Sequence, residues 1–344
     1  MAQEKAPPTG REPALHIDLV AVLVAVSDGQ PKVMTIRDGD ALPSGPFEVS
    51  HRSLQSGLRT WVEEQTAHPL GYMEQLYTFA DRDRTSRGAR RSISISYLGL
   101  TREVAGKGEA GWRSWYDYFP WEDRRVGSPV FVEKAMIPLL RAWAKAGDDL
   151  PKRRERAERL ALTFGLDGSP WNEELILQRY ELAYEAGIVE EAVRAGTGEK
   201  AALFPGRAMR GDHRRILATG VARLRAKIKY RPVVFELMPP TFTLLQLQRA
   251  VEALAGRPTH KPNFRRLIEQ QELVEETGAT AADALGRPAK LYRFRRAVLA
   301  ERAAAGTKPP LTRYYTLFEY IDYTQTEYKY DGFRRAFGPR RLPL

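Results

Sequence analysis

Two adjacent carboxylates, Glu63 and Glu64, stand near the end of an amphipathic stretch that predicts a helix over residues 54–64. Carboxylates at positions i, i+3 and i+4 share one helix face, where they can hold the Mg²⁺ ions that neutralise a pyrophosphate and activate water. Thr60 stands at the first position of that triplet, so one ligand is missing. Glu63 and Glu64 therefore hold one Mg²⁺ weakly or, in the interpretation we favour, form an acidic, solvated helix turn.

The stretch from residue 45 to residue 67 resembles a degenerate Nudix box. That family pattern is a glycine, five residues, Glu, seven residues and then Arg-Glu-apolar-x-Glu-Glu-x-Gly-apolar. The positions that fit it are Gly45, Arg59, Trp61, Glu63, Glu64 and Ala67. The positions that depart from it are His51, Thr60 and Thr66, which replace two glutamates and the second glycine. The resemblance implies a nucleotide-binding fold, and the departures predict that it is not a working hydrolase.

Residues 236–294 have the pattern of a winged helix-turn-helix. Thr243 and Gln246 predict a capping box at the start of a helix that Gly256 ends. A second helix is expected over residues 263–271, after Pro262. Its inward side chains are predicted to be Phe264, Leu267 and Ile268, and its outward ones Lys261, Arg265 and Arg266. Strands expected at 273–277 and 290–294 enclose a loop that would be the wing.

These elements predict a set of contacts with double-stranded DNA. The side chains expected to face the major groove, where Asn can pair with adenine and Arg with guanine, are Lys261, Asn263, Arg265 and Arg266. Thr243 and Gln246 are expected at phosphates, and Arg287 and Lys290 at the backbone or minor groove. The alternative is a charged helix face that is simply solvated, but the helix-turn-helix-wing context favours DNA.

A nucleotide effector needs cations for its pyrophosphate and a flat apolar surface for its adenine. The candidates, in or beside expected strands, are Arg37, Tyr77, Phe79, Arg82 and Arg90. Core packing explains Tyr77 and Phe79 equally well. Six aromatic residues crowd between Trp112 and Trp121; a core or dimer contact is favoured there over stacking on a ligand.

Composition narrows the class of protein. The chain has 344 residues, of which 43% are hydrophobic and 28% charged, as in soluble globular proteins of about two domains. Its net charge of +11 suits a polyanionic partner. It has no cysteine, and its five histidines lack metal-ligand spacing, so a thiolate or zinc site is not expected. No apolar run is long enough to span a membrane, and we expect a cytoplasmic protein.

The expected fold class is α+β. A flexible N-terminus (1–14) precedes a Nudix-like effector-sensing domain with a mixed sheet (15–204), which carries a helical insertion at about 111–204. Helices are expected there over 132–146, 151–164 and 171–194. A basic linker helix (205–231) leads to the winged helix domain (232–300) and an aromatic C-terminal tail (301–344). The linker region holds nine Lys or Arg and a single acid, Asp212.

Taken together, several segments resemble the NrtR family of Nudix-related transcriptional regulators of NAD metabolism. They are the degenerate box, residues 70–84, the helix starting near Asp212, and FELMPPTFTLLQLQ leading to NFRR and GRPAKLYRF. The resemblance implies a homodimeric repressor on a palindromic operator, released by ADP-ribose or a related NAD-derived nucleotide, with no required cofactor. The insertion and the tail depart from the family plan.

Two other functions are open at this point. One is an active Nudix-type ADP-ribose pyrophosphatase with an appended regulatory domain. The other is a binding module without effector control, in which the winged helix and the basic linker tether the chain to nucleic acid or to a protein.

Overall fold

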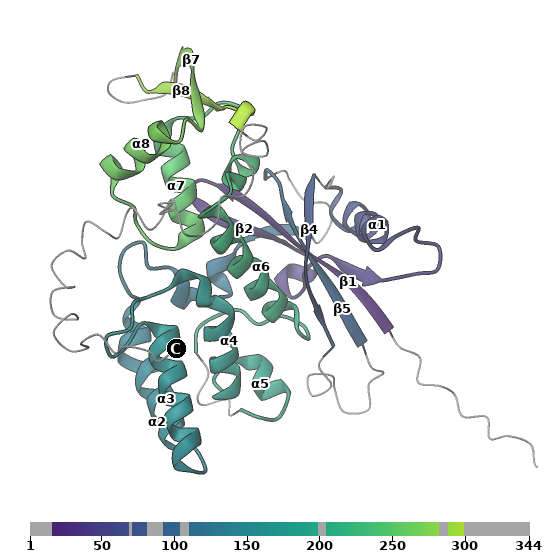
Figure 1. The fold of residues 1–344 in the computed structure, drawn as a ribbon. Coiled ribbons are helices and arrows are strands. Elements are labelled where there is room, and N and C mark those ends of the chain that lie inside the picture. Colours follow the sequence, from purple (N-terminus) through teal and green to yellow (C-terminus); the bar gives the residue numbers. More distant parts are fainter. Residues whose placement is uncertain are drawn as a thin grey trace, which may run out of the picture.

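A six-stranded mixed sheet is the central element of the first half of the chain (Figure 1). The computed structural model describes residues 16–68, 71–80, 92–103, 110–198, 204–281 and 288–298. The strand order is β4-β5-β1-β2-β6, with β3 also paired to β1, and only β1 and β5 run parallel. The strands are β1 (His16–Ser27), β2 (Gln30–Thr35), β3 (Ser44–Pro46), β4 (Tyr72–Phe79), β5 (Ser92–Leu100) and β6 (Gly111–Ser114).

The central strand β1 is apolar on both faces because both faces are covered. Its Leu19, Ala21 and Leu23 join one cluster with helix α1 (Leu54–Thr66). Its alternate residues Val20, Val22 and Val24 join a second cluster with helix α6 (His213–Ile228). The two helices therefore lie on opposite sides of the sheet (Figure 1).

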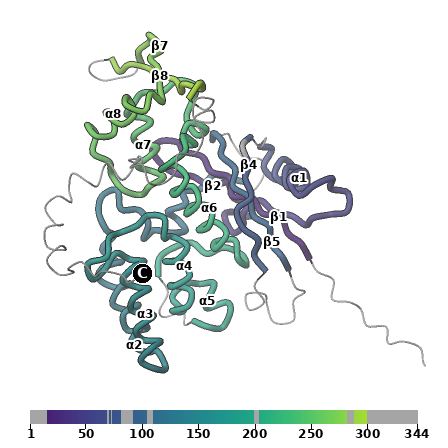
Figure 2. Tube along the Cα trace, viewed as in Figure 1, coloured from purple at the N-terminus to yellow at the C-terminus, as the bar shows by residue number. Residues whose placement is uncertain are grey.

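The helical insertion predicted at about 111–204 contains four α-helices among its described residues, and they lie below α6 in Figure 2. They are α2 (Ile137–Lys145), α3 (Leu150–Phe164), α4 (Ile176–Glu185) and α5 (Glu190–Arg194). A π-helical turn (Val132–Met136) precedes α2, next to Pro138, which lacks a backbone donor. No helix in the described parts of the chain is long and apolar enough to cross a membrane.

The prediction of one helix over residues 171–194 is wrong. A 3₁₀ turn (Glu173–Leu175) leads into α4, and the chain breaks before α5 at Gly187, whose φ is +71°. A side chain at residue 187 would meet the backbone of Gly198 at 2.9 Å. The break is therefore set by a contact eleven residues along the chain, which helical periodicity cannot show.

The aromatic segment after β6 is part of the core. Trp115, Tyr116, Tyr118, Phe119 and Trp121 are all buried. Two short 3₁₀ turns (Trp115–Asp117 and Pro120–Glu122) carry them. The favoured interpretation, core packing over ligand stacking, is confirmed for these five.

Helix α6 lies in the interior of the fold, so part of the positive charge expected on the basic linker helix (205–231) is buried. Its apolar residues are buried as predicted, but so are three of its cations. Arg214 pairs with Glu191 at 3.1 Å, Arg225 with Glu122 at 2.5 Å, and Lys227 with Glu74. These side chains neutralise carboxylates of the sheet and of the insertion, so they are not presented to an outside polyanion.

The winged helix forms the far end of the described chain (Figure 1). A 3₁₀ turn (Val233–Leu237) leads to α7 (Leu244–Ala255), α8 (Lys261–Gln270), β7 (Val274–Thr280) and β8 (Lys290–Phe294). Helix α7 ends at Gly256 in the left-handed conformation, as the sequence predicts. Phe235 stacks on Phe294 with ring centroids 4.4 Å apart, which joins the leading turn to the second wing strand.

Candidate DNA interface and effector site

The start of α7 is held by the predicted capping box. Thr243 Oγ1 accepts the N–H of Gln246 at 3.2 Å, and Gln246 Oε1 accepts the N–H of Thr243 at 2.7 Å. Thr243 is nearly buried, whereas Gln246 is exposed. Both side chains are engaged in fixing the helix, and their expected proximity to phosphates stays a prediction.

Helix α8 presents three cations to the outside, Lys261, Arg265 and Arg266, as predicted. It packs inward through Phe264, Leu267 and Ile268. The expected exposure of Asn263 is wrong, because its side chain is only 9% exposed. Helix α8 begins at Lys261 rather than at residue 263. Asn263 therefore lies one turn before Leu267, four residues on, and shares its buried face.

The wing strands carry cations that are already paired with glutamates. Lys290 Nζ lies 2.8 Å from Glu276 Oε1, and Arg293 Nε lies 2.6 Å from Glu275 Oε1. The Lys290 side chain is 62% exposed, so it is accessible to a phosphate. Phe242 and Tyr292 exchange two backbone hydrogen bonds, which fix the wing beside the start of α7. Arg287 lies outside the described residues.

The segment that resembles a Nudix box, residues 45–67, leads into helix α1 and lacks a full set of carboxylates. Glu63 and Glu64 are exposed on α1. At the two lost positions, Thr60 Oγ1 donates to the carbonyl of Ser56, and His51 Nδ1 accepts the N–H of Glu48. Within the described ranges, no three His, Asp or Glu side chains come close enough to hold a metal ion together. The expected weak site on Glu63 and Glu64 stays a prediction.

Three positions of the box, Gly45, His51 and Trp61, have clear packing roles. Trp61 donates its indole N–H to the carbonyl of Pro46 at 2.8 Å, and any side chain at Gly45 would overlap its ring. The His51 ring lies edge-on to Trp61 with centroids 6.1 Å apart. The residue that replaces a glutamate is thus packed into the loop that leads to α1.

The expected effector residues are not gathered in one place. Arg37 follows β2 and is exposed, whereas Tyr77 and Phe79 lie on β4. Strands β1 and β5 separate β2 from β4, which spaces those two strands by roughly 14 Å. Phe79 is buried under the guanidinium of Arg215, 5.1 Å from its ring centre, as in the core interpretation. Tyr77 is 58% exposed and remains a candidate; Arg82 and Arg90 lie outside the described residues.

The turn that carries Arg37 brings in two arginines that the sequence analysis missed. Arg37 and Asp38 are both left-handed, with φ of 54° and 53°, a strained conformation for residues other than glycine. Asp38 is held by Arg113, at 2.5 Å, and by Arg207, at 3.2 Å. No local pattern could have linked residues that are 75 and 169 positions from Asp38.

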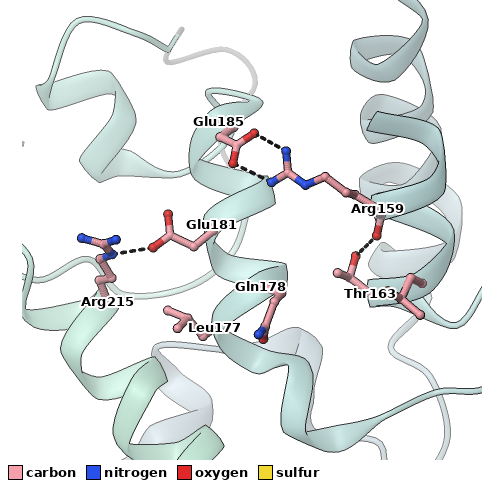
Figure 3. A pocket seen from close by; sticks show the side chains of 8 residues that line it. Arg159, Thr163, Leu177, Gln178, Glu181, Glu185 and Arg215 are labelled. Carbon is pink, nitrogen blue, oxygen red and sulfur yellow. Dashed lines mark hydrogen bonds and ion pairs between the residues drawn. The ribbon is translucent and has the colours of Figure 1, made fainter. Parts of the chain in front are cut away.

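A shallow cleft of about 450 Å³ lies between α3, α4 and α6, away from the expected effector residues (Figure 3). Its charged side chains already pair with one another. Arg159 binds Glu185 at 2.6 Å, and Arg215 binds Glu181 at 2.5 Å. The cleft therefore lacks an unbalanced charge that would call for an ionic ligand.

The structure defines a class: a mixed-sheet domain joined to a winged helix, with an exposed cationic face on helix α8. Residues 234–294 match the family model of the NrtR DNA-binding winged helix domain. The chain is similar to the ADPR responsive transcriptional repressor NtrR of Acinetobacter baylyi, with 42% identity over 83 residues, or 24% of this chain. That match spans only about a third of the relative's length, 33%.

The overall fold is also similar to that of a solved structure. Shewanella oneidensis NrtR in complex with a 27mer DNA matches with a TM-score of 0.50 and 20% identity, over 83% of this chain and 95% of that one. In both its winged helix and its overall fold, this chain is NrtR-like.

Proposed function

We propose that this protein is a transcriptional repressor that binds operator DNA through its winged helix and is released by a nucleotide in its sheet domain. The observation that carries the proposal is the exposed cationic face of α8, in a domain that matches the NrtR DNA-binding winged helix. Its Lys261, Arg265 and Arg266 would enter the major groove.

The effector we propose is ADP-ribose or a related NAD-derived nucleotide, and the regulated genes those of NAD metabolism. The A. baylyi relative is named as an ADPR-responsive repressor, which supports ADP-ribose as the first ligand to test. The strained turn of Arg37, with Arg113 and Arg207 beside it, offers the guanidinium groups that a pyrophosphate needs.

We also propose that the repressor acts in the cytoplasm as a homodimer on a palindromic operator. Two copies related by a twofold axis place two recognition helices in successive major grooves, about one helical turn apart.

The proposal includes the loss of hydrolysis. Its support is that Thr60 and His51 stand where the Nudix pattern has glutamates, and that both side chains are engaged in local hydrogen bonds. Glu63 and Glu64 alone would hold Mg²⁺ weakly. AMP formation from ADP-ribose and Mg²⁺ that disappears in Glu64→Gln would overturn this part and favour the pyrophosphatase.

Fluorescence anisotropy with duplexes from upstream of NAD-metabolism genes tests the whole proposal. We expect a specific complex that ADP-ribose dissociates and that Arg265→Ala with Arg266→Ala abolishes. The matched control is Arg141→Ala with Arg154→Ala, which removes the same charge from exposed residues of the insertion, 47% and 81% accessible. Binding that persists in the α8 variant, or falls equally in both, would refute the interface. A specific complex that no NAD-derived nucleotide affects would favour a binding module without effector control.

A further inference from the structure

The last turn of α7 is bonded to residues outside the winged helix. Carbonyl groups at a helix C-terminus have no partner within the helix and need donors from elsewhere. Three such donors come from the aromatic segment and from α6. They are Tyr116 Oη to Ala253 O at 2.6 Å, Arg225 Nε to Leu254 O at 2.9 Å, and Arg124 N to Gly256 O at 2.7 Å.

The contact at Gly256 is too close for any side chain. Its φ is +73°, and a Cβ atom there would overlap the carbonyl oxygen of Glu122 and come within 2.9 Å of Tyr116 Oη. The glycine that ends α7 is thus required twice, by backbone conformation and by packing. Residues 116–125, here called the bridging segment, fit directly against the helix end.

The same segment also holds the sheet. Arg125 Nη1 donates to the carbonyl of Gly29 at 2.7 Å, and its Nη2 donates to Gln30 Oε1 at 2.9 Å. Gly29 lies in the tight turn between β1 and β2, and Gln30 is the first residue of β2. Asp123 forms an ion pair with the same guanidinium, with 2.8 Å between Arg125 Nη2 and Asp123 Oδ2. The bridging segment therefore bonds to the β1–β2 hairpin on one side and to α7 on the other.

Glu122, at the centre of the segment, is fully buried between two arginines. Its carboxylate lies 2.5 Å from Arg179 Nε on α4 and 2.5 Å from Arg225 Nη1 on α6, and all three side chains are 0% exposed. Burial by itself would raise the pKa of Glu122, but the two guanidinium groups outweigh it and hold that pKa below its usual value. Because Arg225 also donates to Leu254 O, Glu122 fixes the group that holds α7.

We propose that the bridging segment sets the orientation of the winged helix on the sheet domain, and that Glu122 and Tyr116 are positioning residues for operator recognition. Helix α8 begins six residues after α7 ends, so a change in the tilt of α7 is carried to Lys261, Arg265 and Arg266. Arg125 bonds the β1–β2 hairpin to the bridging segment, so a shift of the hairpin moves that segment and, with it, the end of α7. The part of this inference that concerns DNA rests on the proposed function.

Distance measurement by spin labels tests the positioning without DNA. The chain has no cysteine, so Gln55→Cys on α1 and Gln270→Cys on α8, both exposed, give one label on each domain. Doubly labelled chains diluted with unlabelled protein report only distances within one chain. We expect a narrow distribution in the parent protein and a broader or shifted one in Tyr116→Phe and in Glu122→Gln.

Thr163→Val is the matched control. It also removes one buried hydroxyl that donates to a carbonyl, but its acceptor is Arg159 in the same helix, α3, at 2.7 Å. It should keep the narrow distribution and the operator affinity of the parent. Tyr116→Phe should weaken operator binding by about fivefold, the equivalent of one hydrogen bond, and leave binding to non-operator DNA unchanged.

Each result decides a different point. A narrow, unchanged distribution in folded Tyr116→Phe overturns the positioning role, whatever the DNA result. A broadened distribution in a protein whose parent binds no DNA supports the positioning role and overturns the proposed function. If Glu122→Gln does not fold, Tyr116→Phe alone carries the test, because it leaves the buried charges paired.

Discussion

A partly buried histidine at the start of α6 makes the stability of this protein depend on pH. His213 Nδ1 accepts the backbone N–H of Leu42 at 2.9 Å, so this nitrogen must be unprotonated in the folded state. Burial penalises the imidazolium and lowers the pKa of His213 to about 4, although Asp18 and Asp40 act in the opposite direction. The histidine therefore joins α6 to the sheet domain only in its neutral form.

The sign and size of the effect follow from linkage. In the unfolded chain the histidine titrates near 6.5, so at lower pH the unfolded state binds a proton that the folded state refuses. The contribution of His213 to the free energy of unfolding has its full value above pH ~6.5 and falls as the pH decreases toward ~4. At about 1.4 kcal/mol for each pKa unit, the full loss is about 3 kcal/mol, and at pH 5 it is about 2 kcal/mol.

Urea unfolding of the parent and of His213→Asn at pH 7 and pH 5 isolates this contribution. Asparagine offers an amide oxygen near the place of Nδ1 and does not titrate. Between the two pH values, the parent should lose about 2 kcal/mol more than the variant, whereas His16→Asn, at a half-exposed histidine, should lose as much as the parent. A parent and a His213→Asn variant that lose equal free energy would refute the reasoning.

Three further predictions follow from the interface, the end of α7 and the degenerate box. Arg265→Ala should lower the slope of log K against log salt by about 0.9 if its guanidinium contacts one phosphate, as measured by anisotropy between about 50 and 200 mM salt; an unchanged slope would exclude that contact. Gly256→Ala should lower the free energy of unfolding in urea by more than about 1 kcal/mol, since it adds left-handed strain to an overlap with Glu122. Asn tolerates the left-handed conformation better than Ala, so a larger loss of free energy in Gly256→Asn than in Gly256→Ala would come from the larger side chain. Glu64→Gln should leave ADP-ribose affinity within about twofold by calorimetry in the presence of Mg²⁺, and a larger loss would restore a metal role for this residue.

Local patterns in the sequence were sufficient to predict the structure of segments that depend only on residues a few positions away. The capping box of Thr243 and Gln246 and the stop at Gly256 depend on neighbours three or four residues away, and both are confirmed. Runs of β-branched, aromatic and other apolar residues predict strands over residues 72–79 and 92–100, and β4 and β5 span those residues.

The interior of α6 shows why other features escaped prediction. A run of cations on a helix is usually solvated, and nothing near Arg225 in the sequence indicates a buried acid. Its partner Glu122 lies 103 residues away, and Glu74, the partner of Lys227, lies 153 away. Asn263 was misplaced for a smaller reason: the predicted helix began at this residue, whereas α8 begins at Lys261, so Asn263 lies inside the helix on the same face as the buried Leu267.

The positive charge of the chain is therefore only partly available to DNA. The net charge of +11 includes cations of α6 that neutralise carboxylates inside the fold, and the wing cations Lys290 and Arg293 are paired with Glu276 and Glu275. A phosphate that binds Lys290 must replace a carboxylate, so that contact contributes less than one with a solvated lysine. Operator affinity should thus depend mainly on the outward face of α8. The orientation of that face, which the bonds at the end of α7 fix, then matters more for recognition than the overall charge.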